Sequence, residues 1–185
     1  MQVHSDRTLK LPSSVLTIGA LDGVHRGHQA LISNSKKRAI EFGVPLVVYT
    51  FDPPPRVYFK NAMLLTSIEE KVKRLRLLGV DHVVVANFDA DYLSRGVNLF
   101  LDELKELNPL EIWEGPDFQF GRNREGDVNT LRKHFPVNVL DPICCSSGEV
   151  ISSSRIRFLI MREMLGKAEQ LLGWNGITTG NLAEK

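Results

Sequence analysis

The sequence predicts an α/β fold, in which a parallel sheet of about five strands carries helices on both faces. Three observations lead to this prediction. Short apolar runs alternate with amphipathic stretches along the chain, as in repeated strand–helix units. A glycine-rich turn joins the first apolar run to the first helical stretch. The length of 185 residues suits one domain with a sizeable core.

The expected elements alternate in order. Strands are expected at residues 15–18, 46–51, 82–86, 111–113 and 137–140. Helices are expected at 28–42, 68–78, 97–107 and 127–135, and from about 154 to 172 with a break near Gly166. Ser67 and Glu70 have the spacing of a capping box, and Gly43 and Gly79 stand where helices end. In such sheets, ligands bind at the carboxyl ends of the strands, near the point where the strand order reverses.

The composition argues against several classes of protein. The net charge of +1 gives no field that would attract nucleic acid or an anionic membrane. No apolar stretch approaches membrane-spanning length, and the N-terminus lacks a signal-peptide core. Cys144 and Cys145 are adjacent, a poor geometry for a disulfide, so we expect a reduced cytoplasmic protein. The basic runs at 36–38 and 71–76 are interpreted as solvated helix faces, and no feature indicates a particular oligomeric state.

The turn after the first strand carries the most chemistry. It reads Gly19-Ala20-Leu21-Asp22-Gly23-Val24-His25-Arg26-Gly27-His28. Backbone N–H groups in such a turn can approach a phosphate, and the helix that follows favours negative charge at its start. The spacing fits neither a Walker loop nor the dinucleotide fingerprint. No Cys, Glu or third His stands nearby to complete a zinc site, and a pair of solvated histidines in a tight turn remains the alternative interpretation.

Further segments stand at the ends of other predicted strands. Residues 50–55 hold three prolines beside an aromatic ring, which is also the composition of a plain rigid turn. Residues 115–127 combine spaced aromatic and acidic side chains, and Phe118 and Phe120 fit a pocket rim or a core equally well. Residues 151–157 open the last helix with serines and an arginine, which could cap the helix or bind an anion.

Taken together, these segments resemble the motifs of the FAD synthetase family, from residue 15 to about residue 173. The family's first motif, G-x-F-D-G-V-H-x-G-H, is matched with Leu21 in place of the aromatic residue. Its F-x-P-H-P turn falls at 51–55, with Pro54 in place of the histidine. Its motifs G-x-D-F-x-F-G-x-x-x-x-G-D and I-S-S-S/T-x-I-R are matched at 115–127 and 151–157.

The resemblance implies a Rossmann-like nucleotidyltransferase that transfers AMP from ATP to FMN, giving FAD and pyrophosphate by direct in-line attack. Mg²⁺ is expected to accompany ATP, with no metal ligand assigned to the protein. The residues implied as catalytic are His25, His28, Ser154 and Arg157. Those implied for ATP are Gly19, Ala20, Leu21, Asp22, Gly23, His25, Gly27, His28, Ser153 and Arg157. Those implied for the flavin are Phe51, Pro53, Pro55, Asp117, Phe120, Gly121, Arg122 and Asp127.

Two other functions stay open. A nucleotidyltransferase for phosphopantetheine or a nicotinamide nucleotide would share the H-x-G-H pattern, but is not expected to carry G-x-D-F-x-F-G. A non-catalytic flavin- or nucleotide-binding module is the other, although both histidines and Arg157 are present. The departures at Leu21 and Pro54 suggest a lowered affinity for FMN.

The resemblance also suggests a domain division. Residues 1–173 are expected to form the nucleotidyltransferase domain, followed by a tail at 174–185. Family members usually carry a riboflavin kinase domain after this stretch, and the tail is too short for one. The chain is therefore expected to be either monofunctional or the first domain of a longer protein.

Overall fold

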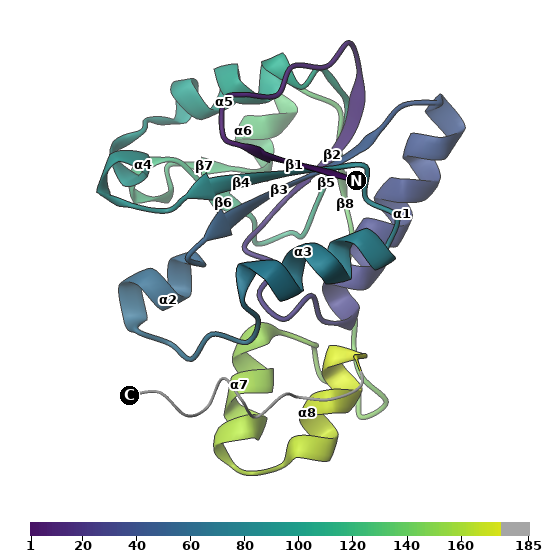
Figure 1. The fold of residues 1–185 in the computed structure, drawn as a ribbon, viewed down its shortest axis with the longest axis vertical. Helices are drawn as coiled ribbons and strands as arrows, with labels where there is room; N and C mark the ends of the chain where they lie inside the picture. The colour runs from purple at the N-terminus through teal and green to yellow at the C-terminus, as the bar shows by residue number, and fades with distance from the viewer. Residues whose placement is uncertain (175–185) are drawn as a thin grey trace.

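A computed structural model describes residues 1–174, and a parallel six-stranded sheet forms its centre (Figure 1). The strand order is β1-β4-β3-β2-β5-β8, and each neighbouring pair is parallel. The order reverses at β2, because the chain continues to β3 on one side and reaches β5 later on the other. The strands are β1 (Gln2–Ser5), β2 (Ser14–Ile18), β3 (Leu46–Asp52), β4 (His82–Asn87), β5 (Pro109–Glu114) and β8 (Val137–Val139).

This sheet confirms the predicted fold class, and each expected strand is present within a few residues of its expected bounds. The sequence did not predict β1, which pairs with β4 at the edge of the sheet and holds mostly exposed residues. It also did not predict the antiparallel pair β6 (Gln119–Phe120) and β7 (Gly126–Asp127), which is too short to show a period.

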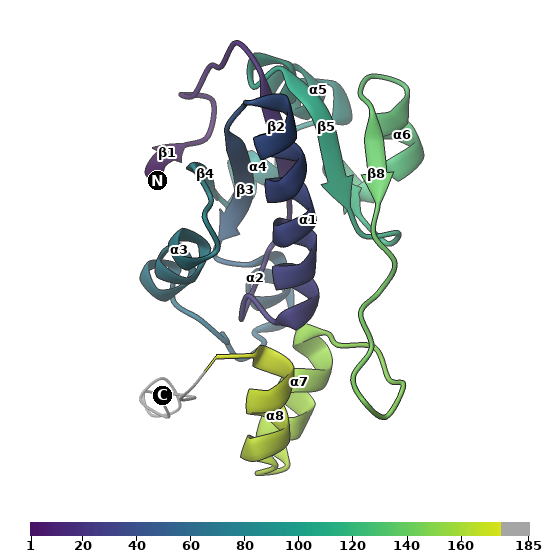
Figure 2. The ribbon, with the colours of Figure 1, turned by 90° about the vertical axis from the view of Figure 1, so that its right-hand side faces the viewer.

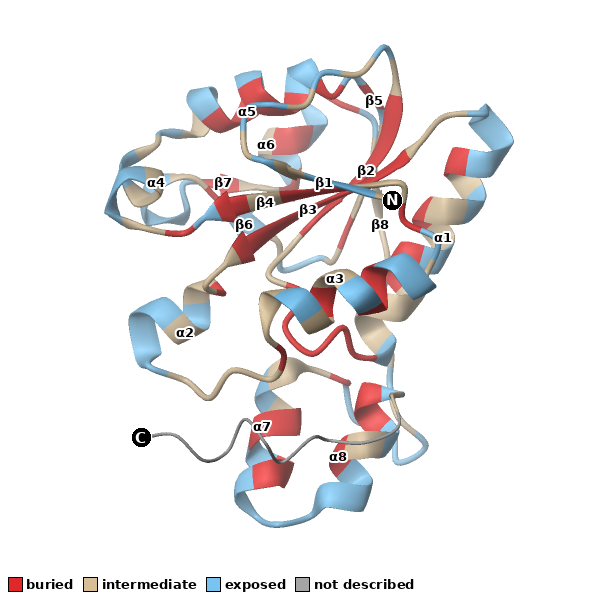
Figure 3. Ribbon diagram, viewed as in Figure 1, coloured by how far each residue is buried: buried red, intermediate tan, exposed pale blue. Residues whose placement is uncertain are grey.

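Helices cover both faces of the sheet, and alternate residues of β2 reach the two layers. Val15 packs in one hydrophobic cluster with Ile32 of α1 (Arg26–Phe42) and Leu75 of α3 (Ile68–Leu77). Leu16 packs in another with Phe100 of α5 (Val97–Glu106) and with α6 (Val128–Arg132). Figure 3 shows the buried residues gathered along the central strands. A strand covered on both faces reads as a continuous apolar run, which is why β2 was visible in the sequence.

The last two helices form a smaller unit with its own core. Figure 2 shows α7 (Ser153–Met161) and α8 (Leu165–Leu172) beneath the start of α1. Ile156 and Leu171 belong to a separate hydrophobic cluster of this unit. The expected break near Gly166 is present a few residues earlier, at 162–164, and Gly166 itself lies inside α8. Glu163 adopts a positive φ of 57°, which an α-helix cannot continue through.

Short elements follow several strand ends, namely α2 (Pro55–Lys60), α4 (Ala90–Ser94) and the 3₁₀ turn η1 (Arg122–Arg124). The helix signals at 67–70 and Gly43 are confirmed. The Ser67 hydroxyl accepts from the Glu70 N–H at 3.3 Å, and Gly43 ends α1 in the left-handed conformation. None of the described helices has both the length and the apolar character needed to cross a bilayer.

Candidate functional site

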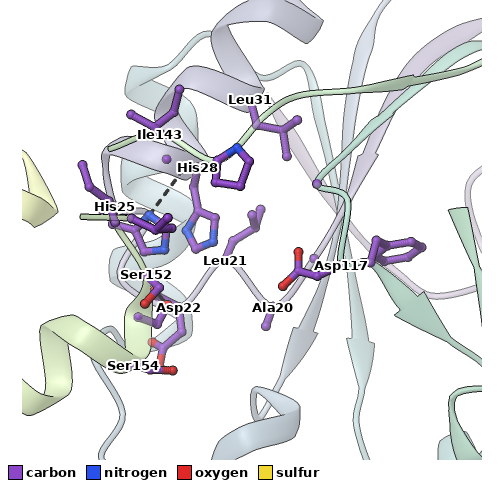
Figure 4. Close-up of a pocket in the computed structure, with 18 of the residues that line it drawn as sticks. Ala20, Leu21, Asp22, His25, His28, Leu31, Asp117, Ile143, Ser152 and Ser154 are labelled. Carbon is purple, nitrogen blue, oxygen red and sulfur yellow. Dashed lines mark hydrogen bonds between the residues drawn. The ribbon is translucent and has the colours of Figure 1, made fainter. Parts of the chain in front are cut away.

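A cavity of about 630 Å³ opens at the carboxyl ends of β2 and β5, where the strand order reverses. Its walls come from the turn after β2, the start of α1, the segment after β5 and the start of α7. Figure 4 shows Asp22, Ser152 and Ser154 together on one side of the view and Asp117 on the other. The cavity therefore lies where the sequence placed the glycine-rich turn.

His25 and His28 form a stacked pair at the start of α1. Their ring centroids are 3.6 Å apart, and the His25 Nδ1 caps the helix by accepting from the His28 N–H at 3.4 Å (Figure 4). Burial lowers the pKa of His25 to about 4 and lowers that of His28 well below its usual range. Both rings are therefore uncharged at neutral pH, and the buried Nδ1 of His28 has no partner among the described residues.

The turn itself presents free donors to the cavity. Ala20, Leu21 and Asp22 line the cavity, and their N–H groups have no acceptor within residues 1–174. Leu21 and Val24 hold positive φ angles of 47° and 41°, a conformation that non-glycine residues rarely adopt. Strained backbone of this kind clusters at ligand sites. Three successive donors beside a helix N-terminus are suited to an anion.

Asp22 and Arg157 form a buried ion pair that fixes this turn. Asp22 accepts from the N–H groups of Leu65 and Thr66, both at 3.1 Å, and from the Arg157 guanidinium. Arg157 also donates through Nε to the Met63 carbonyl at 2.7 Å. Burial raises the pKa of Asp22, and Arg157 opposes that shift. Arg157 lines the cavity, but some of its N–H groups are already bonded within the protein, so only the rest could bind a ligand.

The serines at the start of α7 have separate roles. Ser152 caps the helix by accepting from the Arg155 N–H at 3.3 Å, whereas the Ser153 hydroxyl donates to the Asp22 carbonyl at 2.8 Å. Ser154 accepts from Arg56 of α2. Arg56 also lines the cavity and was missed in the sequence, although it directly follows the proline run.

The residues expected on the flavin side are only partly brought to the cavity. Asp117 lines it, beside Phe118 and Pro54. Phe51 and Phe120 belong to the hydrophobic cluster between the sheet and helices α5 and α6. Asp127 caps α6 by accepting from the Thr130 N–H at 2.8 Å. Gly121 and Arg122 begin the η1 turn, while Pro53 and Pro55 flank Pro54. A flavin-binding role for these residues stays a prediction.

Three buried charged side chains near the turn were not predicted. Glu114, at the end of β5, lines the cavity and accepts from the Ile18 N–H at 2.6 Å. Burial raises its pKa well above the usual range. Lys71 of α3 is 1 % exposed, so the interpretation of the 71–76 run as a solvated face is wrong for this residue. It is also wrong for Arg74, which is buried and donates to the Gly23 carbonyl at 3.0 Å.

The comparisons with known proteins agree with this geometry. Residues 8–155 match the family model described as FAD synthetase. The chain belongs to the FAD synthetase family.

Relatives of this family in several bacteria are similar over most of the chain. A putative bifunctional riboflavin kinase/FMN adenylyltransferase of Geobacillus thermodenitrificans is 50% identical and is matched over 94% of this chain and 98% of its own length. The bifunctional riboflavin kinase/FMN adenylyltransferase of Escherichia coli is 36% identical, and the match covers 92% of this chain but 58% of that protein. The crystal structure of a macrolide-efflux protein from Streptococcus pneumoniae superposes with a TM-score of 0.81 at 26% identity, covering 92% of this chain and 61% of that one.

Proposed function

We propose that this chain is an FMN adenylyltransferase, which transfers AMP from ATP to FMN and releases pyrophosphate. The observation that carries this proposal is the meeting of two helix starts and three free backbone N–H groups around the stacked pair of neutral imidazoles. Such donors suit a polyphosphate. The family membership and the relatives named for this activity support the choice of substrates.

The reaction needs no covalent intermediate, because the FMN phosphate can attack the α-phosphorus of ATP directly. Positioning and charge stabilisation are then the work of the protein. His25 and His28 would donate to the phosphates, and Ser154 and Arg157 would hold them from the α7 side. ATP would enter as its Mg²⁺ complex, with the ion held by phosphate oxygens. In nucleotide sites Mg²⁺ usually keeps phosphate and water ligands and takes few from the protein.

The flavin would occupy the part of the cavity toward Asp117. Asp117 lies across the view from Asp22 and Ser154 (Figure 4). Asp117, Phe118 and Pro54 line the cavity directly. The other residues expected on the flavin side would act indirectly, by shaping the two loops that carry Asp117, Phe118 and Pro54. They are Phe51, Pro53, Pro55, Phe120, Gly121, Arg122 and Asp127.

The deciding experiment incubates the purified chain with MgATP and FMN and resolves the products by chromatography. FAD and pyrophosphate are expected in equal amounts. Riboflavin is the control, because it lacks the phosphate that attacks. Adenylylation of nicotinamide mononucleotide or phosphopantetheine in place of FMN would instead favour the alternative nucleotidyltransferases. Binding of FMN and ATP without any product would favour a non-catalytic module.

A further inference from the structure

Lys71 sits directly behind the phosphate-binding turn. Its ammonium group donates to the Ala20 carbonyl at 2.8 Å, to the Phe51 carbonyl at 3.1 Å and to the Thr50 hydroxyl at 3.3 Å. The side chain does not line the cavity, whereas Ala20 does. One buried cation of α3 therefore joins the turn after β2 to the end of β3.

The bond to Ala20 also fixes a donor that faces the ligand. A trans peptide group is planar, so the Ala20 carbonyl and the Leu21 N–H point in opposite directions. Because Lys71 holds the carbonyl from behind, the Leu21 N–H points away from Lys71. Leu21 lines the cavity, and its N–H group has no acceptor within residues 1–174. Lys71 thus sets the orientation of a backbone donor before any ligand arrives.

The charge of Lys71 is costly for folding, which argues against a purely structural role. All three groups that accept from its ammonium are uncharged. Burial lowers the pKa of Lys71 to about 8, with Asp22 and Asp52 opposing the shift. At neutral pH the protonated form of Lys71 is therefore less favourable in the folded protein than in the unfolded chain, which lowers the free energy of unfolding. Features that cost stability are expected at functional sites.

The positive charge also acts on the cavity. Lys71 is one of the groups that lower the pKa of His28, although burial is the larger cause. Its field therefore extends to the ring that would meet the phosphates. The charged and titratable groups around Lys71 are Asp22 of the turn, Asp52 of β3, His28 of α1 and, through Asp22, Arg157 of α7.

We propose that Lys71 is a positioning residue for the nucleotide, whose ammonium group orients the Leu21 N–H toward the phosphates and places a positive charge behind them. This proposal rests on the proposed function, because it takes ATP as the ligand. Lys71 does not touch the substrate, so its effect is expected to follow the number of phosphate charges on the ligand. A side chain that only packed the interior would affect all ligands of the cavity alike.

The test is calorimetric binding of ATP and of adenosine to Lys71→Met at pH 7. Methionine keeps most of the length and removes the charge. ATP affinity is expected to fall about 10-fold, the size of one lost charged hydrogen bond, and adenosine affinity to change less than about twofold. Lys36→Met is the matched control, because Lys36 pairs with Asp81 away from the cavity and its loss should leave both affinities unchanged. Equal losses for ATP and adenosine, or no loss, would overturn the proposal.

Measuring ATP affinity against pH gives a second test, which uses the unmodified protein and so does not depend on how well a variant folds. ATP affinity of the unmodified protein is expected to fall as pH rises through about 8, where Lys71 loses its proton. Lys71→Met should show no such fall, and Lys36→Met should show it in full. Thr50→Val removes a hydroxyl that accepts from Lys71 and itself donates to the Ala20 carbonyl at 3.2 Å, so it should also weaken ATP more than adenosine. A flat ATP affinity from pH 7 to 9.5 in the unmodified protein would contradict the proposal. These binding measurements need no FMN. They can therefore contradict the role of Lys71 while FAD formation is observed, and they can support that role while no FAD is formed.

Discussion

His25 and His28 show how burial prepares single residues for charged ligands. Both rings are neutral in the free protein, because burial disfavours the imidazolium form. A neutral ring still donates one hydrogen bond, and negative charge nearby raises its proton affinity. The pair can therefore gain charge as phosphates bind, without carrying that charge in the unliganded fold.

Replacing His28 tests this pair directly. His28→Ala is expected to lower FAD formation by about 10²-fold or more, the effect of losing one donor to charge that develops in the transition state. Folding should change little, because the ring faces a cavity. His134→Ala is the matched control, since His134 is exposed after the end of α6 and does not line the cavity, so its loss should leave turnover unchanged. A folded His28→Ala with near-normal turnover would remove the catalytic assignment.

His25 also makes stability depend on pH. Its folded pKa of about 4 lies below the ordinary value of 6.5, so the unfolded chain binds the proton first as pH falls. The folded protein therefore loses about 2–3 kcal/mol of stability from this residue between pH 6.5 and 4. His25→Asn keeps a helix-capping oxygen but cannot titrate, so urea unfolding should show a smaller loss of stability over that range. An identical pH slope in the variant and the unmodified protein would contradict this account.

The helix starts are the elements that build the site, and the sequence predicted them unevenly. The turn at 19–28 could be placed because glycines and histidines mark it, and β2 because Val15, Leu16 and Ile18 make it mostly apolar. Lys71 could not be placed, because in an amphipathic helix rich in lysine and arginine nothing in sequence distinguishes a buried cation from a solvated one. Glu114 and Arg56 were missed for a related reason, since the burial of Glu114 and the contact of Arg56 with Ser154 depend on segments distant in the chain.

Gly166 offers a test of where the last helical region is interrupted. The structure places it in the first turn of α8, with open space where a Cβ would stand. Gly166→Ala is therefore expected to raise the free energy of unfolding by about 0.5 kcal/mol, because alanine loses less backbone entropy in a helix. Gly43→Ala is the contrasting variant. It also meets open space, but its φ of 67° should cost about 1 kcal/mol. A destabilised Gly166→Ala, measured in urea, would place the interruption at Gly166 instead.

At the scale of the whole molecule, the site lies between two units with separate cores. The sheet carries one hydrophobic cluster on each face, and α7 with α8 carries a third. Few polar contacts join the α7–α8 unit to the turn after β2. They include the Arg157–Asp22 pair, the Ser153 hydroxyl on the Asp22 carbonyl, and Trp174, whose Nε1 donates to the Val24 carbonyl at 2.8 Å. Of the expected tail, Trp174 is thus packed on the domain, and residues 175–185 lie outside the described part.

This division predicts how the molecule responds to ATP. A small cluster joined to the rest by few polar contacts should open more easily than the central strands, so amides of α7 and α8 are expected to exchange hydrogen faster than those of β2 and β3. ATP would contact the starts of both α1 and α7, and a ligand that binds only the closed arrangement stabilises it. Saturating MgATP should therefore slow exchange in α7 and α8 and in the turn at 19–28.

Amides of α5, on the opposite face of the sheet, serve as the internal control and should not change. Hydrogen-exchange mass spectrometry measures all of these segments in one experiment. Exchange in α7 and α8 that is as slow as in β2, or that ATP leaves unaltered, would show that the two units open together and that the cavity does not join them.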